Sequence, residues 1–191
     1  MLKRIGGNAV RSYYYWIALA VLVLDQITKK IVENGMEVGD KISVIGTFFM
    51  FHYIRNDGAA FSMLRNQRVL FIVITMCVVI GIIWYIQRNR TTGRRLFLAA
   101  LGLILGGAVG NMIDRILYGE VVDFFQFTFG NYIFPIFNIA DIGITVGVAM
   151  ILLDTLLDMK NQGAADSAAP GNGDMQLDGT NEEPERKGHS G

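Results

Sequence analysis

The class of fold is decided by one stretch, VLFIVITMCVVIGIIWYIQ (residues 69–87), which contains no charged side chain. A helix needs about 20 mostly apolar residues to cross the hydrocarbon core of a bilayer. Three further stretches, at residues 13–32, 96–117 and 133–157, are also long and apolar enough. The sequence therefore predicts an all-α integral membrane protein with four transmembrane helices.

The composition agrees with a chain that sits in lipid. Hydrophobic residues make up 52% and charged residues 18% of the 191 positions, which suits one membrane domain better than a soluble one. The formal net charge is +0, so nothing favours nucleic acid as a partner, and we expect none. Cys77 is the single cysteine, which excludes an intrachain disulfide and any CxxC metal site.

The distribution of basic residues predicts the topology. The short connection between the second and third predicted helices carries four arginines, and the two ends of the helical region are also basic. Because cytoplasmic loops are enriched in Lys and Arg, we expect both termini in the cytoplasm. We divide the chain into a cytoplasmic N-terminal tail (1–12), a four-helix domain (13–159) and a polar cytoplasmic tail (160–191). The last tail has too few apolar residues to pack and is predicted to be disordered.

The two outer connections read differently from the helices. Residues 42–53 are rich in β-branched and aromatic side chains, which predicts a small β-rich extracytoplasmic segment between the first two helices. Residues 118–132 are aromatic and are predicted to form a loop at the outer surface. Gly102, Gly106 and Gly110 recur every four residues, which predicts a face where another helix approaches closely.

Polar side chains lie at one depth in three of the predicted helices. An ionisable residue inside a membrane helix costs at least about 2.5–3.5 kcal/mol and is by default a candidate for function. At a rise of 1.5 Å per residue, Asp25, Asn111 and Asp141 lie roughly 18, 21 and 18 Å from the inner side of a 30 Å core. Further candidates share their helix faces or lie in the outer segments at the same level: Lys29, Asn56, Gly58, Asp114, Arg115, Asp123 and Asn138.

Several of these residues have a structural interpretation beside the functional one. Asp25 and Lys29 are four apart and can pair on one helix face, either to stabilise the helix or to support a substrate. Arg115 can extend to lipid headgroups or pair internally with Asp114. Asn138 is interpreted as a hydrogen-bond organiser.

The structural interpretation is weakest for Asp123 and Asp141, because neither has a base nearby in sequence. His52 and His189 make a poor ligand set and no HExxH motif is present, so we predict no metal and no cofactor. Two carboxyls brought close together cannot both ionise cheaply, so one keeps a proton. The ionised member can then activate a water while the protonated member polarises a carbonyl and protonates a leaving amine.

Five blocks of sequence, in order, resemble the lipoprotein signal peptidases (signal peptidase II). The resemblance covers roughly residues 13–159, and the blocks are Asp25-Gln26-Ile27-Thr28-Lys29, Asn56-Asp57-Gly58-Ala59-Ala60-Phe61, Gly106-Gly107-Ala108-Val109-Gly110-Asn111-Met112-Ile113-Asp114-Arg115, Gly119-Glu120-Val121-Val122-Asp123-Phe124 and Phe137-Asn138-Ile139-Ala140-Asp141.

The resemblance implies a membrane aspartic endopeptidase in which Asp123 and Asp141 are the catalytic pair. It implies that six further residues of the blocks shape the site and hold the substrate backbone: Asp25, Lys29, Asn56, Asn111, Arg115 and Asn138. It further implies prolipoprotein substrates, cut just before a cysteine that already carries diacylglycerol. We expect a monomer in the bacterial cytoplasmic membrane, surrounded by lipids, with its site in the outer leaflet.

Two other classes of function are compatible with intramembrane charges. A proton-coupled transporter also uses them, but the chain has no repeated halves and its polar groups cluster in one leaflet. A purely structural subunit would use polar residues to join helices, but it would not need two carboxylates without assigned partners.

Overall fold

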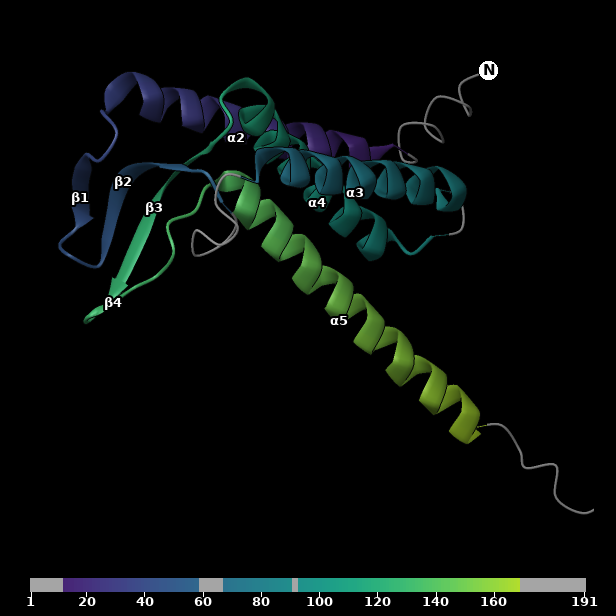
Figure 1. The fold of residues 1–191 in the computed structure, drawn as a ribbon. Coiled ribbons are helices and arrows are strands. Elements are labelled where there is room, and N and C mark those ends of the chain that lie inside the picture. The colour runs from purple at the N-terminus through teal and green to yellow at the C-terminus, as the bar shows by residue number, and fades with distance from the viewer. Residues whose placement is uncertain (1–11, 59–66, 91–92, 169–191) are drawn as a thin grey trace, which may run out of the picture. The chain divides into compact units, whose positions relative to one another are not determined.

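The computed structural model describes residues 12–58, 67–90 and 93–168, with side chains to residue 160 (Figure 1). The described residues up to Leu156 belong to one compact unit, and the later helical residues belong to a second. Residues 59–61 of the second sequence block and residues 169–191 of the predicted tail lie outside the described residues.

Four helices correspond to the four predicted stretches: α2 (Tyr13–Gly35), α3 (Arg68–Asn89), α4 (Arg95–Leu117) and α5 (Ile139–Ala168). Within the described ranges, α3, α4 and residues 139–160 of α5 are long and apolar enough to cross a membrane. The helix α2 is equally long, but it carries four charged side chains in its second half. The chain is thus a helical membrane protein with three candidate spans and a small antiparallel sheet.

The predicted glycine face brings α2 and α4 into close contact. A Cβ atom added at Gly102 would lie 2.5 Å from the Tyr14 carbonyl oxygen, and one added at Gly110 would lie 2.5 Å from Asp25 Oδ2. Only glycine permits this approach, which confirms the predicted close packing. Gly107, on another face of α4, lies in the same way against the Ala140 carbonyl at the start of α5.

The sheet combines strands from both outer segments, in the order β1 (Lys41–Ile45), β2 (Phe49–Asn56), β3 (Val121–Phe129) and β4 (Tyr132–Ile133). The strands predicted within residues 42–53 are confirmed. The prediction of a loop at residues 118–132 is wrong, because most of that segment is β3. Its backbone is paired with β2, a partner 65 or more residues away that local sequence does not reveal.

The start of α5 also differs from the prediction. Residues 134–138 are extended rather than helical, and the Phe137 carbonyl accepts hydrogen bonds from the backbone N–H groups of Phe124 and Phe125. Pro135 explains the difference, since proline lacks an N–H and disfavours a helix before it. At its other end α5 continues to Ala168, so residues 160–168 are helical and not part of a disordered tail.

Candidate active site

Asp141 lies in the first turn of α5, where it forms a reciprocal cap with Asn138. The Asp141 N–H donates to Asn138 Oδ1 over 3.0 Å, and the Asn138 N–H donates to Asp141 Oδ2 over 3.1 Å. This is a capping box, which satisfies two backbone donors that the helix leaves free. The second carboxylate oxygen, Oδ1, accepts a 2.8 Å hydrogen bond from Asn111 Nδ2 on α4. The positive end of the helix further favours a negative charge here.

Asp123 lies on β3, opposite Ile54 of β2, and is 2% exposed. Its Oδ1 accepts a 2.7 Å hydrogen bond from Asn138 Nδ2, and its Oδ2 accepts a 2.8 Å bond from Asn56 Nδ2. Burial, followed by the negative charge of Asp141, raises the pKa of Asp123 from 3.8 to about 7. A carboxyl with this pKa can hold a proton near neutral pH and release it in a reaction.

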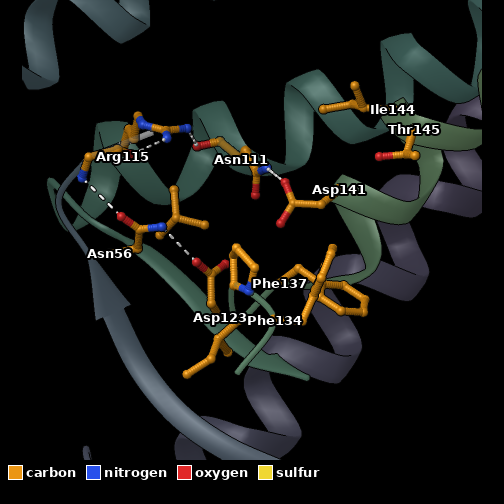
Figure 2. Close-up of a pocket in the computed structure, with 13 residues that line it drawn as sticks. Asn56, Asn111, Arg115, Asp123, Phe134, Phe137, Asp141, Ile144 and Thr145 are labelled. Atoms are coloured by element: carbon orange, nitrogen blue, oxygen red, sulfur yellow. Dashed lines mark hydrogen bonds between the residues drawn. The ribbon is translucent and has the colours of Figure 1, made fainter. Parts of the chain in front are cut away.

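The two carboxyls line the same cavity, of about 310 Å³, although they come from different elements (Figure 2). Asn138 connects them, because its backbone N–H binds Asp141 and its side-chain amide binds Asp123. All four carboxylate oxygens therefore accept a hydrogen bond from an amide. The remaining lining residues are Asn56, Gly58, Asn111, Arg115, Val121, Phe134, Pro135, Ile136, Phe137, Ile144 and Thr145.

Lys29 is the centre of a buried charged cluster behind this cavity. Its ammonium lies 2.8 Å from Asp25 Oδ2 and 2.8 Å from Asp114 Oδ2, and it donates to Asn111 Oδ1 over 2.9 Å. The predicted pairing of Asp25 with Lys29 is thus confirmed. Asn111 Oδ1 also accepts from Asn138 Nδ2 over 3.1 Å. With its oxygen held by two donors, the Asn111 amide must present its nitrogen to Asp141.

The carboxylates of the cluster also hold the backbone next to each catalytic candidate. Asp25 Oδ1 accepts the Ala140 N–H over 3.0 Å, which ties α2 to the first turn of α5. Asp114 Oδ2 accepts the Val122 N–H over 3.3 Å, which ties α4 to β3. The cluster therefore positions the residues that directly precede Asp141 and Asp123 in the chain.

Arg115 does not form the internal pair with Asp114 that was one of its predicted alternatives. Asp114 is paired with Lys29, and the Arg115 guanidinium instead donates to the Asn111 carbonyl over 3.3 Å and the Gly58 carbonyl over 3.1 Å. It also lies 4.9 Å from the centre of the Phe71 ring, a cation–π contact. Arg115 thereby keeps a positive charge at the cavity wall.

Gly58 fixes the orientation of Asn56. The Gly58 N–H donates to Asn56 Oδ1 over 3.0 Å, which leaves the Asn56 nitrogen to bind Asp123. Most of the sequence-predicted site residues thus line the cavity or contact a residue that does, whereas Asp25 and Asp114 reach it only through Lys29 and the backbone of Ala140 and Val122.

Comparison with known proteins identifies the family. The signal peptidase (SPase) II family model matches residues 17–157. This chain belongs to the signal peptidase II family. A lipoprotein signal peptidase of Listeria monocytogenes is 53% identical over 146 residues, which cover 76% of this chain and 94% of that protein. That of Bacillus subtilis (strain 168) is 49% identical over 145 residues, with the same coverage.

A solved bacterial membrane enzyme, determined in meso at 2.3 Å resolution, has the same fold. It superposes with a TM-score of 0.72 at 37% identity, over 78% of this chain and 91% of that chain. Membership of the signal peptidase II family, together with the apolar helices, makes the chain a bacterial membrane protease.

Some residues of this candidate site escaped the sequence prediction. Phe134, Phe137, Ile144 and Thr145 line the cavity, but nothing distinguishes them in sequence from other apolar or small residues. Asp154 was also missed, although an intramembrane carboxylate is a recognisable signal. It is 7% exposed on α5 and its Oδ2 lies 2.8 Å from Arg94 Nε, away from the cavity lining.

Proposed function

We propose that this chain is an aspartic endopeptidase that removes the signal peptide from diacylglyceryl-modified prolipoproteins, cutting just before the lipidated cysteine. The substrate class comes from its relatives, which are named lipoprotein signal peptidases. The observation that carries the mechanism is the pair of carboxyls, Asp123 and Asp141, on one cavity wall with Asn138 between them.

The surroundings of the two carboxyls suggest how they divide the reaction. Both carboxyls accept two amide hydrogen bonds, but Asp141 is the member of the pair that lies at a helix N-terminus, where the positive end of the helix favours a negative charge. Asp123, with its pKa raised to about 7, holds the proton at rest. Asp141 is therefore the general base and Asp123 the general acid.

In the first step Asp141 takes a proton from water, and the water oxygen bonds to the scissile carbonyl carbon while Asp123 donates a hydrogen bond to the carbonyl oxygen. In the second step the carbon–nitrogen bond breaks as Asp123 gives its proton to the leaving amine, and the proton that Asp141 took from water then returns to Asp123 and restores the resting pair. The positive charge of Arg115 at the cavity wall stabilises the oxyanion between these steps. The two proposed steps use no metal or cofactor.

The experiment that tests the pair is cleavage of a purified lipidated precursor by Asp123→Asn and Asp141→Asn. Each variant should lose at least about 10²–10⁴-fold in rate, the usual contribution of a general acid or base. The matched control is Asp154→Asn, which alters a buried carboxylate of α5 outside the cavity and should retain activity. Substantial turnover by either Asp variant at normal expression would exclude the mechanism.

The proposed function includes an arrangement in the membrane. Four helices span it, α2 among them, with both termini cytoplasmic and the cavity in the outer leaflet of the bacterial cytoplasmic membrane. Arg88, Arg90, Arg94 and Arg95 support this orientation. A reporter fused after Ala168 should be active only in the cytoplasm, and activity only outside would contradict the topology.

Two further parts of the proposal concern the oligomeric state and the C-terminal tail. The enzyme acts as a monomer among membrane lipids, and the tail contributes nothing to catalysis. Truncation after Ala168 should leave the cleavage rate nearly unchanged because residues 169–191 contain too few apolar side chains to pack. A large fall in rate for a truncated enzyme that still inserts would assign the tail a role.

A further inference from the structure

A second hollow, of about 270 Å³, lies directly beside the active-site cavity. Asp141, at the boundary, lines both hollows. We call the rest of its lining the α5 groove, and it consists of Phe134, Phe137, Ile142, Thr145 and Val146. The groove thus runs from the catalytic carboxyl along the first two turns of α5.

The walls of the α5 groove are apolar, and its outer edge is open. Ile142 is 40% exposed and Val146 is 45% exposed, on a helix apolar enough to lie in lipid. A ligand in this groove can therefore extend into the bilayer without leaving apolar surroundings. That property fits an acyl chain better than a peptide, whose backbone would need hydrogen-bonding partners.

Thr145 is the hydroxyl-bearing residue of the groove. The hydroxyls of Thr28 and Thr155 bond to carbonyls one turn earlier in their helices, over 2.8 and 2.9 Å. The Thr145 hydroxyl has no hydrogen bond within the part of the chain that the structure describes. Thr145 lines the active-site cavity (Figure 2) and also the second hollow. A free donor between a polar cavity and an apolar groove suits a ligand with one acceptor at the head of a hydrocarbon chain.

The spacing fits the proposed substrate. Thr145 lies four residues, or about 6 Å along the helix axis, beyond Asp141. In a lipidated precursor the modified cysteine directly follows the scissile bond, and the nearer glyceryl ester carbonyl lies about eight bonds from the scissile carbonyl carbon, which is long enough to span this distance. With that carbonyl at Asp141, an ester carbonyl reaches Thr145 and its acyl chain continues past Val146.

We propose that the α5 groove binds one acyl chain of the diacylglyceryl group and that Thr145 donates a hydrogen bond to its ester carbonyl. This inference rests on the proposed function and deepens it. Thr145 is then a positioning residue, which places the lipidated cysteine and hence the scissile bond relative to the two carboxyls.

The first test fills the groove. Val146→Trp is compared with Val148→Trp, because both valines are 45% exposed on the same helix and Val148 does not line the groove. The substrates are precursors that carry either palmitoyl or acetyl chains on the glyceryl group. Val146→Trp should raise KM for the palmitoyl substrate about tenfold, the discrimination expected of a mis-sized apolar pocket. Its kcat and its KM for the acetyl substrate should stay near wild type, as should all values for Val148→Trp.

The second test isolates the hydrogen bond. A dialkyl ether precursor lacks the ester carbonyl, so wild type should cleave it about fivefold less efficiently than the diacyl precursor, as for one neutral hydrogen bond. Thr145→Val should cleave both equally, and Thr145→Ser should restore the preference. Either equal cleavage by wild type or a preference that survives in Thr145→Val would overturn the role of Thr145.

Failure of the proposed function and failure of the groove give different results. If wild type does not cleave lipidated precursors at all, the proposed function falls, and the groove proposal falls with it. If wild type cleaves them and Val146→Trp keeps a normal KM for the palmitoyl substrate, the function stands and only the groove proposal falls.

Discussion

Replacement of Asp123 by asparagine should change how stability depends on pH. The pKa of Asp123 rises from 3.8 to about 7 because the carboxyl is buried and faces Asp141. At 1.36 kcal/mol for each pKa unit, ionisation of this buried carboxyl costs the folded state about 4 kcal/mol. Because the pKa of Asp123 is higher in the folded than in the unfolded protein, the protonated carboxyl contributes fully to the free energy of unfolding below about pH 4. That contribution is lost as the pH rises through about 7. An asparagine side chain does not titrate, so the variant lacks this loss.

The assay is the melting temperature of wild type and Asp123→Asn in detergent micelles, from pH 4 to pH 8. Other titrating groups are common to both proteins and cancel in the difference. For a chain of this size about 4 kcal/mol corresponds to about 10 °C in melting temperature. From pH 4 to pH 8 the melting temperature of Asp123→Asn should therefore rise by about that much relative to that of wild type. The two carboxyls titrate as a pair, so the shift belongs to the pair. If the melting temperatures of the two proteins change with pH in parallel, a raised pKa at Asp123 is refuted.

Three further outcomes follow from the site. Asn56→Ala should lower the cleavage rate on the order of 10²-fold, because the geometry of the site is disturbed. It also removes the hydrogen bond that favours ionised Asp123, so the high-pH limb of the pH–rate profile should move to higher pH. An unmoved limb would leave Asn56 a substrate contact only. Gly107→Ala drives a methyl group into the Ala140 carbonyl and should cut activity about 10²-fold. The control Gly81→Ala places a methyl group that meets nothing within 4 Å, so its activity should stay near wild type. Equal activities of the two variants would count against precise placement of α5. Activity should survive EDTA, and recovery of a lost activity by a divalent ion would point to a metal enzyme.

Much of the fold could be predicted because hydropathy and spacing are local properties. The apolar runs located the helices, and the glycine spacing on α4 located the contact with α2. The pairing of Asp25 with Lys29 followed from helical geometry alone. The common depth of the polar residues indicated one site, but the depth of a residue says nothing about its hydrogen-bond partners.

The errors came from distant partners and from one overlooked signal. The strand β3 depends on pairing with β2, so its own aromatic residues were insufficient to predict it. Arg115 was assigned Asp114 as a possible partner because the two are adjacent, but Lys29 from another helix occupies that carboxylate. The start of α5 was predictable: Pro135 disfavours helix before it, and Asn138 followed three residues later by Asp141 is the pattern of a capping box.

Asn56 shows how geometry changes an interpretation. From sequence, the family resemblance implied that Asn56 holds the substrate backbone. In the structure its nitrogen is already bound to Asp123 and its oxygen to the Gly58 N–H. A side chain that is committed in this way acts on the acidity of Asp123 as well as on the shape of the cavity.

The charged cluster behind the cavity has a consequence for biogenesis. Each of the two helices supplies both signs of charge, with Asp25 and Lys29 on α2 and Asp114 and Arg115 on α4. Asp123 and Asp141 follow later in the chain, and Asp141 is placed only when the Ala140 N–H reaches Asp25. Because α5 is the last of the four helices to be synthesised, the proposed catalytic pair is complete only when α5 is in place.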